Sequence, residues 1–183
     1  YENGTVTYKG KPYTGKLVTS LEDKAIGYEG FITLKEGHLE GQTKMSSKKS
    51  KEEYEFNVKN GEFDGQYIVK SRKKGEITMT LETGVLKAQK INDTEGYKQD
   101  LTFDAAGLAN GTVEMDNQKF SFKDGKALYV GQKNSFMIIK YMKETNSIFT
   151  EATQNGEVIL KEETPLGDVK TVESGIFPAL VGK

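Results

Sequence analysis

Cysteine and tryptophan are absent from this chain of 183 residues, histidine occurs once and proline three times. Without cysteine there can be no disulfides, thiolate metal sites or cysteine nucleophiles, although the redox compartment stays open. No apolar run approaches the roughly 18 residues that a membrane-spanning helix needs. Glycine, in contrast, occurs 20 times and hydrophobic residues make up only 35% of the chain. This composition favours a thin, turn-rich β structure over a thick layered core.

The balance of charge gives no reason to expect nucleic acid as a partner, because the formal net charge is −1. The length fits one domain or one continuous repeat array. The sequence starts at Tyr1 without a methionine, and we expect a mature form whose signal peptide lies upstream. We therefore expect an extracellular or cell-envelope protein, with a cytoplasmic location as the open alternative.

Alternating apolar and polar residues mark the stretch from Glu53 to Ile91 as an up-and-down ribbon of strands. Tyr54, Phe56 and Val58 alternate with polar residues and run into Asn60-Gly61. An Asn-Gly pair between two alternating runs is a strong hairpin signal, because both residues tolerate positive φ.

The hairpin unit repeats along the chain in the motif Gly-x-(Leu/Phe)-x-Gly. The first glycines of four copies lie 24, 23 and 23 residues apart, which is the length of two strands with two turns. We predict repeat turns at Gly37, Gly41, Gly61, Gly65, Gly84, Gly107, Gly111 and Gly125.

These motifs predict an all-β fold: an antiparallel meander of repeated hairpins with a period of about 23 residues, forming an elongated, twisted sheet that is free to curl. Residues 1–162 form the repeat array, and residues 163–183 form an irregular C-terminal cap. The expected strands are 5–9, 13–19, 28–35, 39–45, 52–59, 64–71, 76–82, 85–91, 97–104, 111–116, 119–123, 126–131, 135–141, 147–153 and 157–162. The run Met137-Ile138-Ile139 is apolar on both faces, so we expect a strand that is covered twice or lies at a contact surface.

The best copy of the motif, residues 58–67 (VKNGEFDGQY), resembles the MORN-variant repeats of bacterial proteins described as antitoxin-like. The resemblance covers about residues 1–160, and it departs from the family where Ala88 replaces the second glycine and where tryptophan is missing. It implies a β-hairpin array for scaffolding or partner contact, and it carries over no catalytic residues.

No catalytic constellation is visible, so we expect a protein that is not an enzyme and that needs neither a cofactor nor a metal. The single histidine, His38, stands at a repeat position that Glu62, Val85 and Leu108 occupy in other copies. A surface role fits that position better than catalysis or metal binding. We expect the many carboxylates to lie on the solvent-facing side of strands or in turns. There they stay hydrated and are poorly suited to act as general acids or bases.

Two sets of residues are candidates for binding. Alternating turns of a meander return to the same end of the sheet, which predicts a basic rim that could attract an anionic glycan, a lipid headgroup or an acidic protein. This rim comprises Lys48, Lys49, Lys51, Arg72, Lys73 and Lys74. The recurring aromatic residues suit a buried ladder across the strands, and the alternative is an exposed platform that includes Tyr67, Tyr97 and Tyr129.

Three functions remain open at this point. The leading hypothesis is a non-enzymatic binding or scaffold protein that presents a β surface, with a strand edge as an option, to a protein partner. The second is a module that binds carbohydrate or a membrane surface through tyrosines or the basic rim. The third, an antitoxin-like neutralising role, rests on the family resemblance alone.

Overall fold

The computed structural model describes residues 4–19, 27–47 and 49–181. The chain divides into two compact units. The first contains the chain up to Lys74, the short segment Leu81–Gly84 and the chain from Gly167 onward; the second contains Gly75–Thr80 and Val85–Leu166. Both consist mainly of antiparallel strands that follow one another in sequence, which confirms the predicted antiparallel meander.

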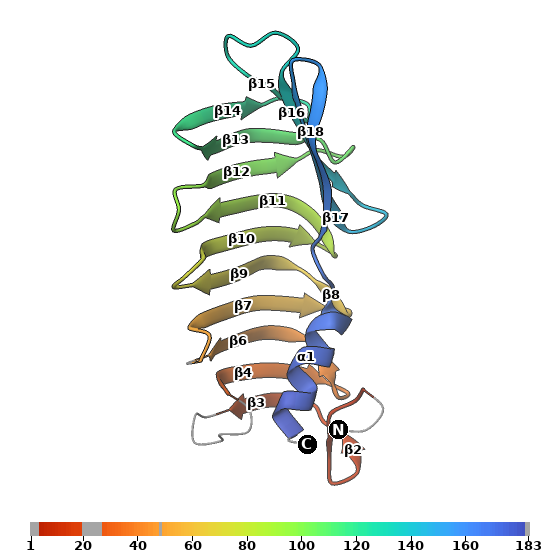
Figure 1. Cartoon of the computed structure of the whole chain (residues 1–183). Helices are drawn as coiled ribbons and strands as arrows, with labels where there is room; N and C mark the ends of the chain where they lie inside the picture. Colours follow the sequence, from red (N-terminus) through yellow and green to blue (C-terminus); the bar gives the residue numbers. More distant parts are fainter. Residues whose placement is uncertain (1–3, 20–26, 48, 182–183) are drawn as a thin grey trace. The chain divides into compact units, whose positions relative to one another are not determined.

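In the first unit, consecutive strands lie side by side in the order β9-β7-β6-β4-β3, while β5 pairs with β4, β8 with β7 and β1 with β2 (Figure 1). The strand bounds are β1 Thr7–Tyr8, β2 Lys11–Pro12, β3 Gly15–Thr19, β4 Tyr28–Lys35, β5 His38–Leu39, β6 Gly41–Ser47, β7 Glu52–Lys59, β8 Glu62–Phe63 and β9 Gly65–Ser71. The predicted strands 39–45 and 64–71 correspond to β5 with β6 and to β9.

The second unit has two antiparallel sheets, ordered β14-β13-β12-β11-β10 and β15-β16-β17-β18. Strand β10 extends into the segment assigned to the first unit. The bounds are β10 Gly75–Glu82, β11 Val85–Asn92, β12 Lys98–Phe103, β13 Ala109–Met115, β14 Gln118–Phe122, β15 Lys126–Leu128, β16 Phe136–Met142, β17 Ser147–Gln154 and β18 Glu157–Pro165.

Two-residue turns with positive φ at both positions explain the glycine spacing. Their φ angles lie between 49° and 89°, the signature of type I′ turns, whose twist matches that of the flanking strands. These turns are Lys9-Gly10, Glu36-Gly37, Asn60-Gly61, Thr83-Gly84, Asp116-Asn117, Asp124-Gly125 and Asn155-Gly156. The other predicted repeat glycines, Gly41, Gly65, Gly107 and Gly111, also have positive φ.

The residue before the second glycine of the motif links one hairpin to the next turn. The side chain of Glu40 accepts a hydrogen bond from the backbone N–H of Asn60 (3.1 Å), and that of Asp64 accepts one from Thr83 (3.1 Å). In the same way, the Thr14 side chain accepts a hydrogen bond from the Glu36 N–H, and the Asn110 side chain accepts one from the Asp124 N–H. In the weak copy this position is Lys87, which has no acceptor atom. A polar acceptor is therefore part of the repeat.

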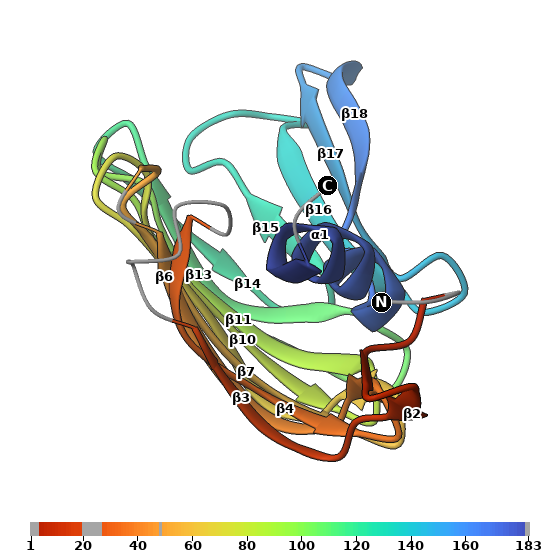
Figure 2. The same cartoon turned by 90° about the horizontal axis from the view of Figure 1, so that it is seen from below.

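One face of the first unit's sheet is apolar and is covered by helix α1 (Val169–Val181), which lies over that face in Figures 1 and 2. Phe177 is completely buried, and Val169 is 5% exposed. The buried apolar side chains of strands β4 to β8 are Ile32, Leu34, Leu39, Met45, Phe56, Val58 and Phe63.

In the second unit, sheet β15-β16-β17-β18 covers the apolar side of the other sheet. The Phe103 and Tyr141 rings lie 6.2 Å apart. Backbone hydrogen bonds fasten β16 to two turns: Tyr141 N–H donates to Gly107 O (2.8 Å) and Ile139 N–H to Gly125 O (2.9 Å). Met137 and Ile139 are buried while Ile138 is half-buried on the opposite face.

The C-terminal segment differs from the irregular cap that the sequence predicts. Strand β18 continues to Pro165, and residues 169–181 are helical. Asp168 caps this helix, since its carboxylate accepts the Thr171 N–H at 2.6 Å. Pro178 argued against a helix, because proline has no N–H to donate within one; here the tertiary contacts of the apolar helix face outweigh that cost.

Candidate functional site

Strand β18 is the edge strand of its sheet, and each of its nine residues is exposed. Its register with β17 shifts at Ala152 and Thr153, so Ile159 is an extra residue in a β-bulge. Among the described residues, no strand pairs with its other edge. The outward N–H and C=O groups of this edge are available to another chain.

The first half of β18 is apolar. Val158, Ile159 and Leu160 are 57%, 59% and 42% exposed, and they are three consecutive members of a small set of large exposed apolar side chains in the described chain. We call these three residues the β18 apolar segment. Isolated exposed apolar residues are ordinary, whereas a run of them on a sheet edge marks a site of interaction or aggregation.

The second half of β18 is charged and anchored to its own sheet. The hydroxyls of Ser147 and Thr145 donate hydrogen bonds to the Glu163 carboxylate, the latter at 2.7 Å. These bonds hold the pKa of Glu163 below its ordinary value. Lys161 Nζ lies 5.8 Å from the centroid of the Phe149 ring. The two halves thus differ: one satisfies its polar groups locally, and the other exposes apolar surface.

A hollow on the outer face of this sheet continues from the β18 apolar segment. Val158, Leu128 and Phe136 line it, and Lys126 Nζ lies 3.9 Å from the Phe136 ring centroid. Thr153 also lines the hollow; its hydroxyl is buried and has no hydrogen-bond partner in the described part of the chain. An apolar side chain from another molecule would fit beside Val158 and Phe136.

The structure brings the two loops of the predicted basic rim together. The Arg72 N–H donates to Lys51 O at 3.4 Å, and Glu52 is paired with Ser71 at the adjoining strand ends. Lys49, Lys51, Arg72, Lys73 and Lys74 are all exposed, whereas Lys48 lies outside the described residues. The two loops are neighbours, and binding of an anionic ligand by them stays a prediction.

The three candidate tyrosines are half-buried and lie in separate surroundings. Tyr67 stacks on Phe56, with ring centroids 5.5 Å apart, and burial raises the pKa of its hydroxyl. Tyr97 donates to Gln99 Oε1 at 2.7 Å, and burial also raises its pKa. Tyr129 packs edge-on against Phe120 at 4.9 Å. These contacts are those of a buried ladder, so no row of these three tyrosines faces solvent.

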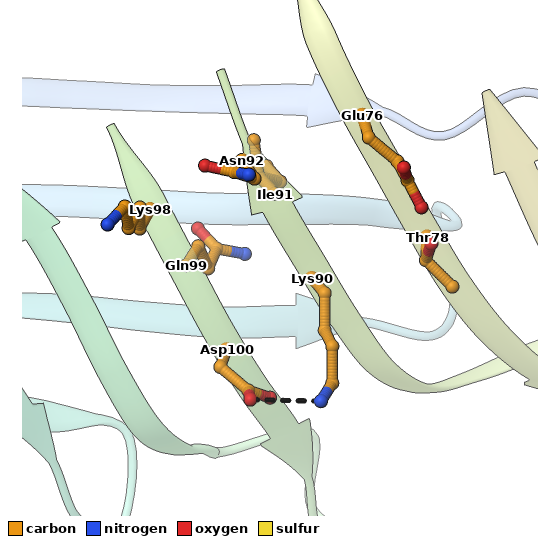
Figure 3. Close-up of a pocket in the computed structure, with 8 residues that line it drawn as sticks. All are labelled: Glu76, Thr78, Lys90, Ile91, Asn92, Lys98, Gln99 and Asp100. Atoms are coloured by element: carbon orange, nitrogen blue, oxygen red, sulfur yellow. Dashed lines mark ion pairs between the residues drawn. The ribbon is translucent and has the colours of Figure 1, made fainter. Parts of the chain in front are cut away.

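A polar hollow lies on the solvent face of β10, β11 and β12 (Figure 3). Lys90 and Asp100 form an ion pair of 3.0 Å across it, and Glu76 and Thr78 line it from β10. Since its cations and carboxylates lie close together and remain in water, the hollow offers neither a net charge nor a desolvated acid for chemistry.

His38 was predicted to have a surface role, and the structure places it where α1 meets β5. Its Nδ1 lies 3.7 Å from Glu173 Oε1, and the same oxygen accepts the Leu39 N–H at 2.9 Å. The sequence analysis did not predict a role for Glu173, which follows the Asp168 cap in the helix. Glu173 fastens the helix to the strand.

Among the described residues, no group of three or more histidine, aspartate and glutamate side chains could hold a metal ion. Nor does a helix in the described ranges have the length and apolar character needed to cross a membrane.

Sequence comparisons give no relative from which a function could be transferred: no family model matches the chain, and no curated protein matches it.

Proposed function

We propose that this protein is a non-enzymatic binding protein whose β18 edge accepts an extended segment of a protein partner. The observation that carries the proposal is the complete exposure of β18 together with its apolar segment. In strand addition, main-chain hydrogen bonds supply affinity and alternate side chains supply specificity. The hairpin repeats also support the proposed MORN-variant relationship and the proposed role of a scaffold.

Protection of the edge is uneven along β18. Lysine and proline are devices that keep edge strands from pairing, and here Lys161 and Pro165 lie in the second half. The bulge at Ile159 interrupts the ladder within the apolar half, so a partner would pair on either side of it. The first half is therefore the place where a partner strand gains most.

The chemistry of β18 defines the partner. Glu157 directly precedes the β18 apolar segment, and Lys161 and Glu162 follow it. Opposite charges and apolar residues that face each other across strands stabilise the pairing. The proposed partner therefore offers an extended segment with β-branched or aromatic residues in its centre and a lysine or arginine toward an end.

A peptide library tests the proposal. Random peptides of nine residues, the length of β18, are selected on the full chain, and the affinities of the enriched peptides are measured by titration. We expect enriched peptides with alternating apolar residues and basic ends. The double variant Val158→Lys/Leu160→Lys should weaken their binding by at least about tenfold, because edge lysines oppose pairing.

The matched control is Val18→Lys, which changes another exposed valine (69%) on β3, the end strand of its sheet. Equal binding by the double variant and the control would overturn the proposal. Concentration-dependent self-association that the double variant abolishes would also overturn it, since the occupant would then be a second copy of the chain.

A second candidate function is binding of an anionic surface by the basic rim. The contact of the Arg72 N–H with Lys51 O favours it, because it places two cationic loops at one end of neighbouring strands. Retention on anionic vesicles tests this function.

A further inference from the structure

The space between α1 and the strands of the first unit contains a cavity of about 180 Å³. Its sheet side is formed by Tyr28, Met45, Tyr54, Phe56 and Tyr67. Its helix side is formed by Thr171, Val172, Gly175 and Ile176. The cavity belongs to the first unit, whereas the surface of the proposed function belongs to the second.

The size of the cavity suits a single aromatic ring. An apolar cavity of about 150 Å³ is large enough to bind benzene. Met45, Val172 and Ile176 give this cavity apolar walls, and Phe56 with Tyr67 adds a pair of stacked rings. The cavity is partly open to solvent, since Thr171 and Gly175 on its helix side are exposed, and a ligand would displace water from it.

Two hydroxyls at the cavity remain available. The Tyr54 hydroxyl donates a hydrogen bond to the Glu52 carboxylate at 2.8 Å. Burial of this hydroxyl is the main cause that raises the pKa of Tyr54, and the bond to Glu52 is the second. The hydroxyls of Tyr28 and Tyr67 have no hydrogen-bond partner within the described residues. Neither oxygen is among the buried atoms that lack a partner, so each hydroxyl reaches water, which a ligand hydroxyl can replace.

We propose that this cavity binds a small neutral aromatic alcohol, a molecule of the size of phenol or cresol. The ring packs against Met45, Phe56 and Val172, and the ligand hydroxyl exchanges a hydrogen bond with the hydroxyl of Tyr67. A cation is disfavoured, because the apolar walls would strip its hydration and Glu52 is already bonded to Tyr54. For so few ligand atoms we expect a dissociation constant on the order of 0.1–1 mM.

The test uses the full chain with phenol, p-cresol, benzene and tetramethylammonium as probes. Binding is followed by ligand-observed NMR and by the shift of the unfolding temperature. We expect saturable binding of phenol and p-cresol, weaker binding of benzene and none of tetramethylammonium.

Two variants locate the site. Tyr67→Phe keeps the ring and removes the hydroxyl, so phenol should bind roughly three- to tenfold more weakly while benzene is unaffected. Gly175→Leu extends a side chain from a position where a Cβ meets no atom within 4 Å, and should abolish binding by filling the cavity. Tyr129→Phe, in the other unit, is the control and should change nothing.

Several results would overturn the assignment. These are absence of saturable binding by the unaltered chain, unchanged phenol affinity in Tyr67→Phe, and binding of tetramethylammonium in preference to phenol. If circular dichroism shows that Gly175→Leu does not fold, Tyr67→Phe and its control decide the question, since neither changes the volume of the core.

Discussion

The two units solve one physical problem in different ways. Each has a sheet with an apolar face, and each face must be covered. In the first unit the cover is the single helix α1, whose buried anchor is Phe177. In the second the cover is another sheet, with β16 bonded through its backbone to Gly107 and Gly125.

The two covers leave different surfaces open. A helix touches a sheet along a narrow stripe, so space remains beside it, and this space is the cavity of about 180 Å³. A sheet covers a broad area but ends in a strand with unpaired backbone groups, and β18 is such a strand. The helical cover therefore leaves a pocket beside the helix, and the sheet cover leaves an exposed strand edge.

The largest expected effects come from removing an aromatic ring that packs between a sheet and its cover. Phe177→Ala and Phe103→Ala each delete a buried ring, and each should lower the free energy of unfolding by about 3–5 kcal/mol. We expect Phe177→Ala to raise hydrogen exchange in α1 and β5 while β16 and β17 stay protected. Phe103→Ala should expose β16 and β17 instead. Equal loss of protection in both units for either variant would show that the covers do not act separately.

The second unit contains a chain of hydrogen-bonded polar side chains whose contribution to its stability can be measured. Gln99 Nε2 donates to Gln89 Oε1 at 2.7 Å, and Tyr97 donates to Gln99. Gln99→Ala leaves both partners unsatisfied and should cost about 1–3 kcal/mol. The triple variant Gln89→Leu/Tyr97→Phe/Gln99→Leu removes every partner and should be close to neutral in urea unfolding. A triple variant that is as unstable as Gln99→Ala would show that these polar groups do more than satisfy one another.

The helical cover should also loosen in acid through its cap. The backbone N–H of Thr171 donates to the Asp168 carboxylate and holds its pKa below the ordinary value of 3.8. The stabilisation by the carboxylate is present above the unfolded pKa and disappears as the pH falls through the folded pKa. The protection factors of amides in the first turn of α1, corrected for the intrinsic exchange rate at each pH, should therefore fall below about pH 4.

Two variants check this effect. Asp168→Ala should weaken the helix by about 1 kcal/mol at neutral pH. Asp168→Asn keeps an acceptor without a titrating group, so it should remove the acid dependence and retain most of the stability. An acid response that persists in Asp168→Asn would point to another group.

The sequence predicts the strands well and the covers poorly, for a physical reason. Turns and alternation are local signals: Asn60-Gly61 and the run Tyr54, Phe56 and Val58 mark a hairpin with a buried face without reference to the rest of the chain. The acceptor residues Glu40 and Asp64 were within the motif too, but their function appears only once the next turn is in place.

Local sequence signals alone did not allow helix α1 to be predicted. Val169, Val172, Ile176 and Phe177 follow a helical spacing, and Asp168 precedes them as a cap. Gly175 and Pro178 oppose a helix on propensity alone, and the apolar sheet face that offsets this cost is more than 100 residues away in sequence. The exposed edge of β18 is likewise a consequence of topology, because nothing in residues 157–165 says that no strand follows.

The smallest expected effect on stability comes from changing the basic rim of the first unit. Lys49→Glu/Lys73→Glu changes exposed side chains, so the free energy of unfolding should stay within about 0.5 kcal/mol of the original. Retention on vesicles that contain phosphatidylserine should nevertheless fall by roughly tenfold or more, since each basic residue near such a surface contributes about 1 kcal/mol. Added salt should erase the difference. The control Lys133→Glu/Lys143→Glu makes the same change of charge on exposed lysines of the second unit, and equal loss in both variants would show that net charge, rather than the rim, governs retention.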